Sequence, residues 1–199
     1  MWVITRREMM TIPATDANVG PALDLGLVIE APAWRGVFPD LELRVQAAVR
    51  AAIAGARADS GGPGNAGKNP GPRQAAAYEM GLVFSDDARL AELNAAYRGK
   101  EGPTNVLAFE NAAPPPKGAP WQLGDVIIAL TRTRAEAAAA GLDIADHAVH
   151  LVVHGVLHLF GYDHENDTEA QYMEALEVRV LSGLGIVDPY RDGAQEKCE

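Results

Sequence analysis

The feature that most constrains this chain is the stretch of residues 147–164, HAVHLVVHGVLHLFGYDH, which contains all five histidines of the protein. On an α-helix, where each residue is rotated by about 100°, four of these histidines fall within one arc about 80° wide. They are His147, His150, His154 and His158. Apolar residues fall on the opposite side, namely Val149, Val152, Val153, Val156 and Phe160. The pattern predicts a helix that packs through one face and presents imidazoles on the other.

Three of the histidines have the spacing of a metal site. His154 and His158 are one helical turn apart, so their rings can point at one ion. Gly155 is expected to keep a side chain away from that ion, and Gly161 offers a left-handed helix stop, after which the chain can fold back to deliver His164. Three neutral nitrogens with one open position are typical of a catalytic rather than a structural zinc site. The sequence therefore predicts one Zn²⁺ per chain, held by His154, His158 and His164.

The neighbours of these ligands have more than one interpretation. His147 and His150 extend the same helix face, and we expect a supporting or packing role for them, with contact to the ligands or to substrate as the alternative. Asp163, beside the third ligand, is a candidate general base and equally a turn residue after Gly161. A site of three imidazoles also suits nickel or copper, so the residues alone leave the metal open.

The spacing His-x3-His-x2-Gly-x2-His is shared with the metzincin proteases, in which the residue after the first histidine is the general base glutamate. Here that residue is Gly155. A peptidase would lack its proton acceptor at the place where helix geometry requires it. The absence argues against peptide hydrolysis and leaves the metal to lower the pKa of water toward about 7.

A second informative stretch is residues 97–107, YRGKEGPTNVL, which leaves a predicted helix, crosses a Gly/Pro turn and enters a predicted strand. Arg98 and Lys100 occupy positions where cations and loop backbone could hold a phosphate. An arginine at the end of a helix also interacts favourably with the helix macrodipole, so this alternative stays open for Arg98.

Hydrophobic periodicity predicts the order strand, helix, strand, helix, strand, strand and three helices. The strand patterns cover residues 23–30, 78–84, 105–109 and 124–130. The helix patterns cover residues 41–58, about 87–99, an alanine-rich segment from 133, the histidine helix from Asp143 or Asp146, and residues 168–185. Residues 133–136 (TRAE) and 168–171 (TEAQ) have the capping-box pattern of a helix start. We therefore expect a single α+β domain, a small mixed four-stranded sheet packed with about five helices.

The chain divides into three parts. Residues 1–21 are unpatterned and expected to be a disordered or loosely attached extension, residues 22–187 a metal-dependent hydrolase domain, and residues 188–199 a C-terminal tail. Within the domain, residues 59–74 (DSGGPGNAGKNPGPRQ) predict a flexible insertion. Its Lys68 and Arg73 could touch a polyanion, but a solvated loop is the favoured interpretation.

Composition bounds the compartment and the partners. The chain is 48% hydrophobic and 22% charged, without a run near the roughly 18 apolar residues of a membrane span. The absence of an apolar signal region and the lone Cys198 favour a cytoplasmic protein without a membrane partner. The net charge of −10 argues against a broad basic nucleic-acid surface. A nuclease would therefore need local cations or its metal to bind phosphate.

The segments HGVLHLFGYDH, YRGKEGPTNVLAF and LGDVII together resemble the YbeY family of bacterial rRNA maturation factors, over about residues 23–185. The resemblance implies a metal-dependent endoribonuclease that prefers single strands. It implies a role in maturing the 3′ end of small-subunit rRNA and in ribosome quality control, with RNA (an rRNA precursor) and the ribosome or its small subunit as partners. By the same resemblance, His154, His158 and His164 match the zinc ligands, and Arg98 matches a functionally implicated arginine.

Two alternatives remain from the residues alone. One is a metzincin-like metallohydrolase of peptides or small molecules, and the other is a non-enzymatic ribosome assembly factor whose metal is structural. The sequence leaves open whether water or the RNA 2′-OH is the nucleophile. It also leaves open the general base, the cleavage site, the protein partners and the oligomeric state.

Overall fold

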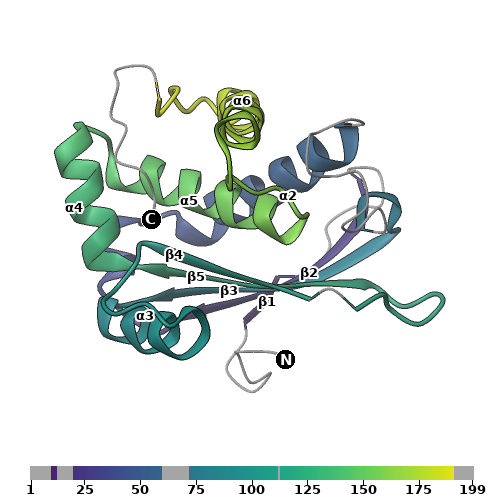
Figure 1. Cartoon of the computed structure of the whole chain (residues 1–199), viewed down its shortest axis with the longest axis horizontal. Coiled ribbons are helices and arrows are strands. Elements are labelled where there is room, and N and C mark those ends of the chain that lie inside the picture. The colour runs from purple at the N-terminus through teal and green to yellow at the C-terminus, as the bar shows by residue number, and fades with distance from the viewer. Residues whose placement is uncertain (1–9, 13–19, 60–71, 112, 191–199) are drawn as a thin grey trace.

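The protein is built on a mixed five-stranded sheet with the strand order β1-β2-β3-β5-β4 (Figure 1). The computed structural model describes residues 10–12, 20–59, 72–111 and 113–190. The strands are β1 (Met10–Ile12), β2 (Ala22–Ile29), β3 (Ala77–Ser85), β4 (Val106–Glu110) and β5 (Trp121–Ala129). β2, β3 and β5 are parallel, whereas β1 and β4 run antiparallel at the two edges.

The four long strands correspond to the four that the sequence predicts, and the α+β class with a mixed sheet is confirmed. β1 is an additional short strand within the 1–21 extension, where Met10 pairs with Leu27 and Ile12 with Leu25. A strand of three residues is too short to show an alternating pattern, which is why the sequence does not reveal it. The rest of the predicted extension, apart from residues 20–21, lies outside the described residues, as do the C-terminal tail from residue 191 and residues 60–71 of the predicted insertion.

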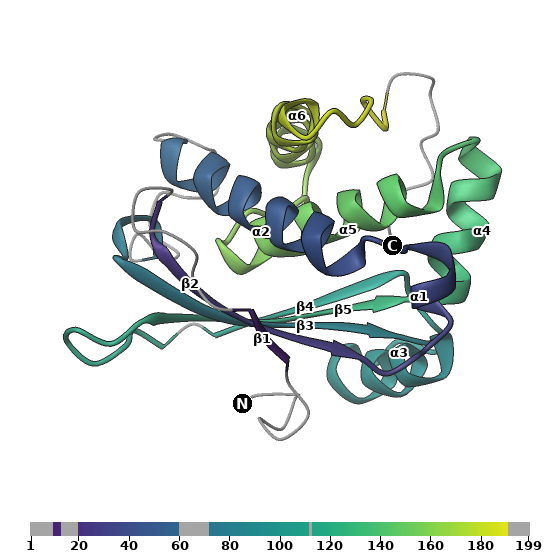
Figure 2. The ribbon, with the colours of Figure 1, turned by 180° about the vertical axis from the view of Figure 1, so that it is seen from behind.

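Helices lie on both faces of the sheet. They are α1 (Trp34–Val37), α2 (Leu41–Ala58), α3 (Asp87–Leu93), α4 (Leu130–Ala140), α5 (Ile144–Leu159) and α6 (Asp167–Gly183), with a 3-10 turn η2 (Pro72–Gln74) and a π-helical turn η3 (Asn94–Arg98). α2 and α5 cover one face, with α6 outside them, and α3 lies against the other (Figures 1 and 2). The five predicted helices are α2 to α6, and α1 adds a single turn. None of the helices in the described ranges has the length and apolar character that a membrane span requires.

The sheet is buried on both faces, as expected from the nearly continuous apolar run of β5. The larger core lies between the sheet and the layer of α2, α5 and α6, and contains Leu25, Trp34, Phe84, Leu123 and Phe160 among its buried side chains. The smaller core lies beneath α3 and comprises Val28, Val83, Leu90, Leu93, Leu107, Ile127 and Ala129. Consecutive residues of β4 therefore face different cores, with Val106 in the larger and Leu107 in the smaller.

Gly155 brings α5 close to the sheet. A Cβ atom at this position would lie 2.6 Å from Val126 Cγ1 on β5. The expectation that Gly155 clears space beside the metal is therefore wrong, because one residue after His154 the helix has already turned by about 100° toward the sheet. The glycine is required by packing between α5 and β5.

The start of α4 also differs from the prediction. The helix begins at Leu130, and Thr133 lies inside it, where its hydroxyl donates to the Ala129 carbonyl oxygen at 2.6 Å. The backbone N–H groups of Thr131 and Arg132 donate instead to Asp87 Oδ1, at 3.1 and 3.2 Å. The predicted capping box at residues 133–136 is wrong because the cap comes from the first turn of α3, 44 residues away.

The last two helices are capped by side chains that precede them. Asp143, one of the two expected candidates, caps α5 by accepting from the Ala145 N–H at 2.9 Å. α6 starts slightly earlier than predicted, and Asn166 caps it by accepting from the Glu169 N–H at 3.0 Å. The predicted capping box at residues 168–171 is therefore wrong, because Asn166 caps the helix two residues earlier.

Candidate metal centre and pocket

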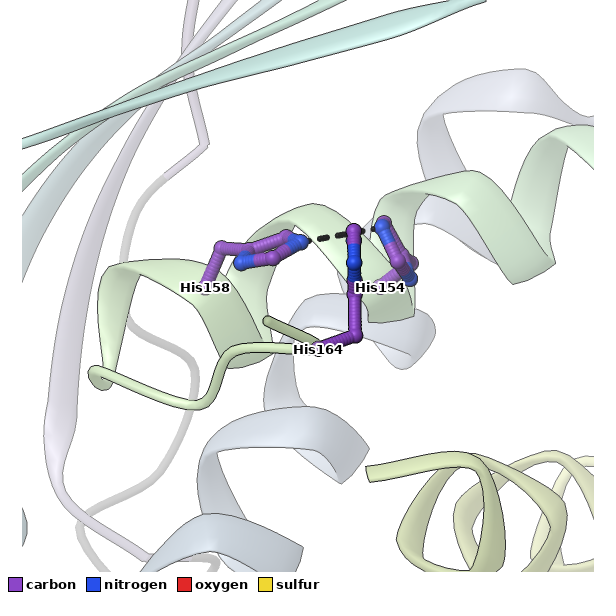
Figure 3. Close-up of side chains that lie close together, drawn as sticks. All are labelled: His154, His158 and His164. Carbon is purple, nitrogen blue, oxygen red and sulfur yellow. Dashed lines mark hydrogen bonds between the residues drawn. The ribbon is translucent and has the colours of Figure 1, made fainter. Parts of the chain in front are cut away.

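Three histidines meet where α5 ends and the chain turns back (Figure 3). His154 and His158 lie one turn apart on α5, and His164 lies on the following loop. Gly161, at φ 83°, ends the helix in the left-handed conformation, as the sequence predicts. One ring nitrogen of each histidine lies within 4.8 Å of the other two, so the three could hold a metal ion.

His154 and His158, the two histidines on the helix, direct their Nε2 atoms at each other. His154 Nδ1–H donates to Glu177 Oε1 at 2.8 Å, and His158 Nδ1–H donates to the Tyr162 carbonyl oxygen at 2.9 Å. A carbonyl oxygen only accepts, so the proton of the neutral His158 ring is on Nδ1 and its Nε2 carries a lone pair. The same holds for His154, because an ionised carboxylate also only accepts. When both rings are neutral, their Nε2 lone pairs face each other across 3.0 Å, an arrangement that a shared cation stabilises.

The protonation states of the site favour metal binding. Burial, together with the neighbouring His154 and His164, lowers the pKa of His158 to about 3. The ring is therefore neutral near pH 7, which is the form that coordinates a metal. Burial alone would raise the pKa of Glu177, but the adjacent His154 and His150 outweigh it and hold this pKa well below its usual range.

Glu177 of α6 is the residue that sequence reasoning missed. It is completely buried, and its second oxygen accepts from His150 Nε2 at 2.7 Å and from the Tyr190 hydroxyl. A buried carboxylate requires such partners. The sequence holds a signal for it, since Glu177 falls on the apolar face of α6 between Met173 and Val180, where a lone acidic residue is unusual.

His147 and His150 support the site through carboxylates. His147 Nε2 lies 3.0 Å from Glu136 Oε2, and the same oxygen accepts from Asn105 Nδ2 at 3.0 Å. Burial would raise the pKa of Glu136, but the hydrogen bonds from His147 and Asn105 lower it. His150 shares Glu177 with the ligand His154. The supporting role expected for these two histidines matches these contacts, and neither joins the group of three nitrogens.

A pocket of about 300 Å³ opens beside the three histidines. Its lining comes from η3, the loop before β4, β4 itself, α5 and the turn after α5: Arg98, Thr104, Asn105, Val106, Leu107, Ala108, Glu110, His154, Gly155, His158, Gly161, Tyr162, Asp163 and His164. The structure thus brings Arg98 to the predicted ligands, although 56 residues separate it from His154 in sequence. Lys100 is exposed and is not part of this lining.

Asp163 has the turn role that the sequence allowed. Its Oδ1 accepts from the His164 backbone N–H at 2.9 Å. It also lines the pocket beside His164. Its second interpretation, as a general base, stays a prediction.

The turn that carries the third ligand is held by the two ends of the predicted insertion. The buried Tyr162 hydroxyl donates to Asp59 Oδ2 at 2.7 Å, and the Arg73 guanidinium donates to the Tyr162 hydroxyl at 3.0 Å and to the Asp59 carbonyl oxygen. Burial and the bond to Asp59 raise the pKa of Tyr162 above its ordinary value. Because the Tyr162 carbonyl accepts from His158, this clamp of Asp59, Arg73 and Tyr162 directly adjoins the three candidate ligands. Lys68, the other cation considered in the insertion, lies outside the described residues.

Comparisons with known proteins identify the family of the chain. A family model described as endoribonuclease YbeY matches residues 69–185, which include Arg98 and the three histidines. A protein named endoribonuclease YbeY from Paramagnetospirillum magneticum is 42% identical over 172 residues, covering 84% of this chain and 96% of that one. The protein of the same name from Alkalilimnicola ehrlichii is 46% identical over 183 residues, covering 92% and 98%. That from Rhodospirillum rubrum is 45% identical over 163 residues, covering 80% and 77%. The chain therefore belongs to the YbeY family of endoribonucleases.

Proposed function

We propose that this protein is a zinc-dependent endoribonuclease that prefers single-stranded RNA. Its role is to mature the 3′ end of small-subunit rRNA and to act in ribosome quality control. The observation that carries the metal-dependent part is the pair of Nε2 atoms 3.0 Å apart, His154 and His158, whose other nitrogens are both committed to acceptors. Family membership supports RNA as the substrate.

The donor set fits zinc. Three imidazoles with an open fourth position match the catalytic zinc sites of proteins. His154 is only 9% exposed while His164 is exposed, so the group is anchored in the protein on one side and open to solvent on the other. When bound, Zn²⁺ polarises a phosphoryl oxygen and makes water a better nucleophile at neutral pH. Glu177 and the Tyr162 carbonyl keep the two helical rings in the tautomer that coordination requires.

Arg98 supplies the fixed positive charge of the pocket. Its guanidinium can bind two phosphoryl oxygens at once and stabilise the charge that develops on them during cleavage. The chain carries a net charge of −10, so RNA must be attracted by such local groups rather than by the protein as a whole. We assign Arg98 to phosphate binding and His154, His158 and His164 to the zinc.

Three matched variants test the assignment in purified protein. His158→Ala should lose both bound zinc and RNA cleavage, whereas Arg98→Glu should hold about one zinc per chain and lose cleavage. Lys100→Glu makes the same charge change two residues away, outside the pocket lining, and should keep both. Metal content is measured by mass spectrometry and cleavage on single-stranded oligonucleotides, with all variants purified identically to exclude contaminating ribonuclease. Full zinc content and full cleavage in His158→Ala would show the assignment to be wrong.

The biological role needs a separate test in cells. We propose an rRNA precursor on the ribosome or its small subunit as the substrate, in the cytoplasm. Cells without the protein should accumulate small-subunit rRNA with an unprocessed 3′ end, and the wild-type chain should restore processing while Arg98→Glu should not. Restoration by a folded variant that binds no metal would instead favour an assembly factor without catalysis.

A further inference from the structure

β4 is an edge strand, and its free side can be identified residue by residue. The Ala129 N–H donates to the Asn105 carbonyl oxygen at 2.8 Å, and the Asn111 N–H donates to the Leu123 carbonyl oxygen at 2.9 Å. In an antiparallel pair, residues alternate between those that bond the neighbouring strand and those whose backbone groups point away from it. The odd-numbered residues of β4 therefore bond to β5. The even-numbered ones, Val106, Ala108 and Glu110, turn their N–H and C=O groups away.

The outward groups of β4 adjoin the metal pocket. Val106, Ala108 and Glu110 all line it together with the three histidines. The Val106 N–H is already bonded to Asn105 Oδ1 at 2.7 Å. Ala108 is half-buried, and within the described ranges we find no hydrogen bond to its outward N–H or C=O. Ala108 thus offers a backbone donor and a backbone acceptor side by side, next to the ligands.

An exposed aromatic ring flanks the same edge. Tyr97 is 53% exposed, and its ring packs edge-on against Phe109, with 5.0 Å between the ring centroids and 66° between the planes. Phe109 directly follows Ala108 and belongs to the α3 side of the sheet, packed against the smaller core. Tyr97 in turn directly precedes Arg98, which lines the pocket. The edge of β4 at Ala108 therefore lies between the metal pocket and an exposed tyrosine.

We propose that Ala108 and Tyr97 form a subsite for one unpaired nucleobase of the RNA strand that is cut; this rests on the proposed function. A nucleobase carries adjacent donors and acceptors on its Watson–Crick edge, which match the N–H and C=O of one strand residue. An aromatic side chain beside that edge can stack on the face of the base. A base in a duplex has both its edge and its faces occupied, so the subsite accepts only a single strand.

A cycle of protein variants and modified RNAs tests the proposal in the zinc-loaded full chain. The substrates are one single-stranded RNA and a set in which each nucleotide around the mapped cleavage site is in turn replaced by an abasic one. For the wild type, one abasic position should lower kcat/KM by about tenfold, the order expected for one stacked base. Tyr97→Ala should lower kcat/KM about tenfold on the intact RNA and no further on that abasic RNA, because the two changes remove the same contact.

Four further variants identify the groups involved. Tyr97→Phe keeps the ring and should show the same loss on the abasic RNA as the wild type. Leu43→Ala removes a different exposed hydrophobic side chain, 71% exposed, and should have no effect. Ala108→Pro removes the outward N–H without removing a β4–β5 hydrogen bond, since proline is tolerated at such edge positions. It should behave like Tyr97→Ala, whereas Ala108→Val keeps the N–H and should keep the loss at that abasic position, whatever its effect on the overall rate. If Ala108→Pro does not fold, the Tyr97 cycle decides alone.

The outcomes separate this inference from the proposed function. If cleavage is measurable throughout and every abasic RNA loses the same factor in Tyr97→Ala as in the wild type, the subsite is wrong and the endoribonuclease stands. If the zinc-loaded wild type cleaves none of the RNAs, the proposed function fails, and the subsite fails with it. A single abasic position whose effect disappears in both Tyr97→Ala and Ala108→Pro supports the subsite.

Discussion

Two pairs of histidines on α5 share one helix face and differ in the nitrogen that the protein engages. In His154 and His158 the bonded atom is Nδ1, so Nε2 remains for an ion. In His147 and His150 the bonded atom is Nε2, which meets Glu136 and Glu177, respectively. Their Nδ1 atoms are buried and have no hydrogen-bond partner among the described residues.

The difference teaches that position on a helix face does not by itself make a histidine a ligand. All four rings share this face, and the partner of each ring decides which nitrogen is presented. That partner lies on another helix for His154 and in the turn after α5 for His158. Where a carboxylate takes Nε2, the ring becomes a support. Where a carbonyl or carboxylate takes Nδ1, Nε2 is left to bind a metal.

The largest expected effect is a difference in zinc affinity between alanine variants of two histidines that contact the same carboxylate. His154→Ala removes a ligand and should weaken zinc affinity well beyond the roughly 10–100-fold that loss of a ligand's hydrogen-bond partner costs. His150→Ala also removes a contact to Glu177 but no ligand, and should weaken affinity by less than about tenfold. Competition with a chelator measures both. Equal losses in the two variants would break the comparison.

Substitutions of the two carboxylates that contact these histidines, Glu177 and Glu136, should also differ in their effect on zinc affinity. Glu177→Gln leaves one accepting oxygen and no charge where His154, His150 and Tyr190 now donate to two oxygens. The His154 proton is then held less firmly on Nδ1, and zinc affinity should fall about 10–100-fold. Glu136→Gln is the matched control, because Glu136 contacts His147 and Asn105 rather than a ligand. It should leave the affinity within a few-fold of the wild type. A larger loss in Glu136→Gln than in Glu177→Gln would contradict the division into ligands and supports.

The metal-free protein should lose stability in acid. The pKa of His158 is about 3 in the folded protein and about 6.5 in the unfolded chain, so between these values the unfolded chain binds more protons. The free energy of unfolding should therefore rise with pH across this window and fall as pH decreases from 6.5 toward 3, by at most about 1.4 kcal/mol per pH unit. The lowered pKa of Glu177 acts in the same direction below about 4.5.

Urea unfolding of chelated protein at several pH values between 5 and 7 measures the slope. In this range Glu177 is ionised in both states, and comparison with His158→Gln separates the contribution of His158 from that of the other four histidines. His158→Gln should flatten the slope relative to the wild type. An unchanged slope would mean that the His158 ring does not remain neutral in the folded protein.

A substitution at Gly155 tests the packing of α5 against the sheet. Gly155→Ala would place a Cβ atom against Val126 and should destabilise the protein by about 1–2 kcal/mol, despite the better helix propensity of alanine. Gly183→Ala, a helical glycine with open space around the added atom, should be neutral or slightly stabilising. Thermal unfolding compares the two, and metal content should stay near one zinc per chain in both. Loss of zinc without loss of stability in Gly155→Ala would restore the expectation that this glycine serves the metal.

The smallest effect is expected at the clamp. Tyr162→Phe removes the hydroxyl that contacts Asp59 and Arg73 but keeps the carbonyl that accepts from His158. Zinc affinity should weaken by only a few-fold, because the ligand's own hydrogen bond survives. Tyr172→Phe, which also removes a hydroxyl bonded to Asp59, is the control and should have less effect, since Tyr172 lies on α6 and not in the turn between the ligands. A loss of a hundredfold in Tyr162→Phe would mean that the clamp positions the turn far more strongly than its contacts indicate.

Much of the fold follows from patterns that are local in the chain. The four long strands and the helices α2 to α6 were predictable, because their periods of 2 and 3.6 residues need only a few neighbours to be recognised. The short strand β1 and the true starts of α4 and α6 were not. β1 exists through its pairing with β2, and the α4 cap comes from Asp87 in another helix.

By itself, the sequence determined the local geometry of the site: two histidines one turn apart, a left-handed glycine stop and a third histidine just beyond it. These features depend on residues within a few positions of one another. The tertiary structure alone decided that the buried Glu177 engages Nδ1 of His154 and Nε2 of His150, and that Gly155 faces the sheet. Glu177 lies 23 residues from His154 and 27 residues from His150 in the chain. A hydrogen bond across that separation exists only once the sheet and its helices have packed, because no local pattern encodes which distant side chain will be its partner.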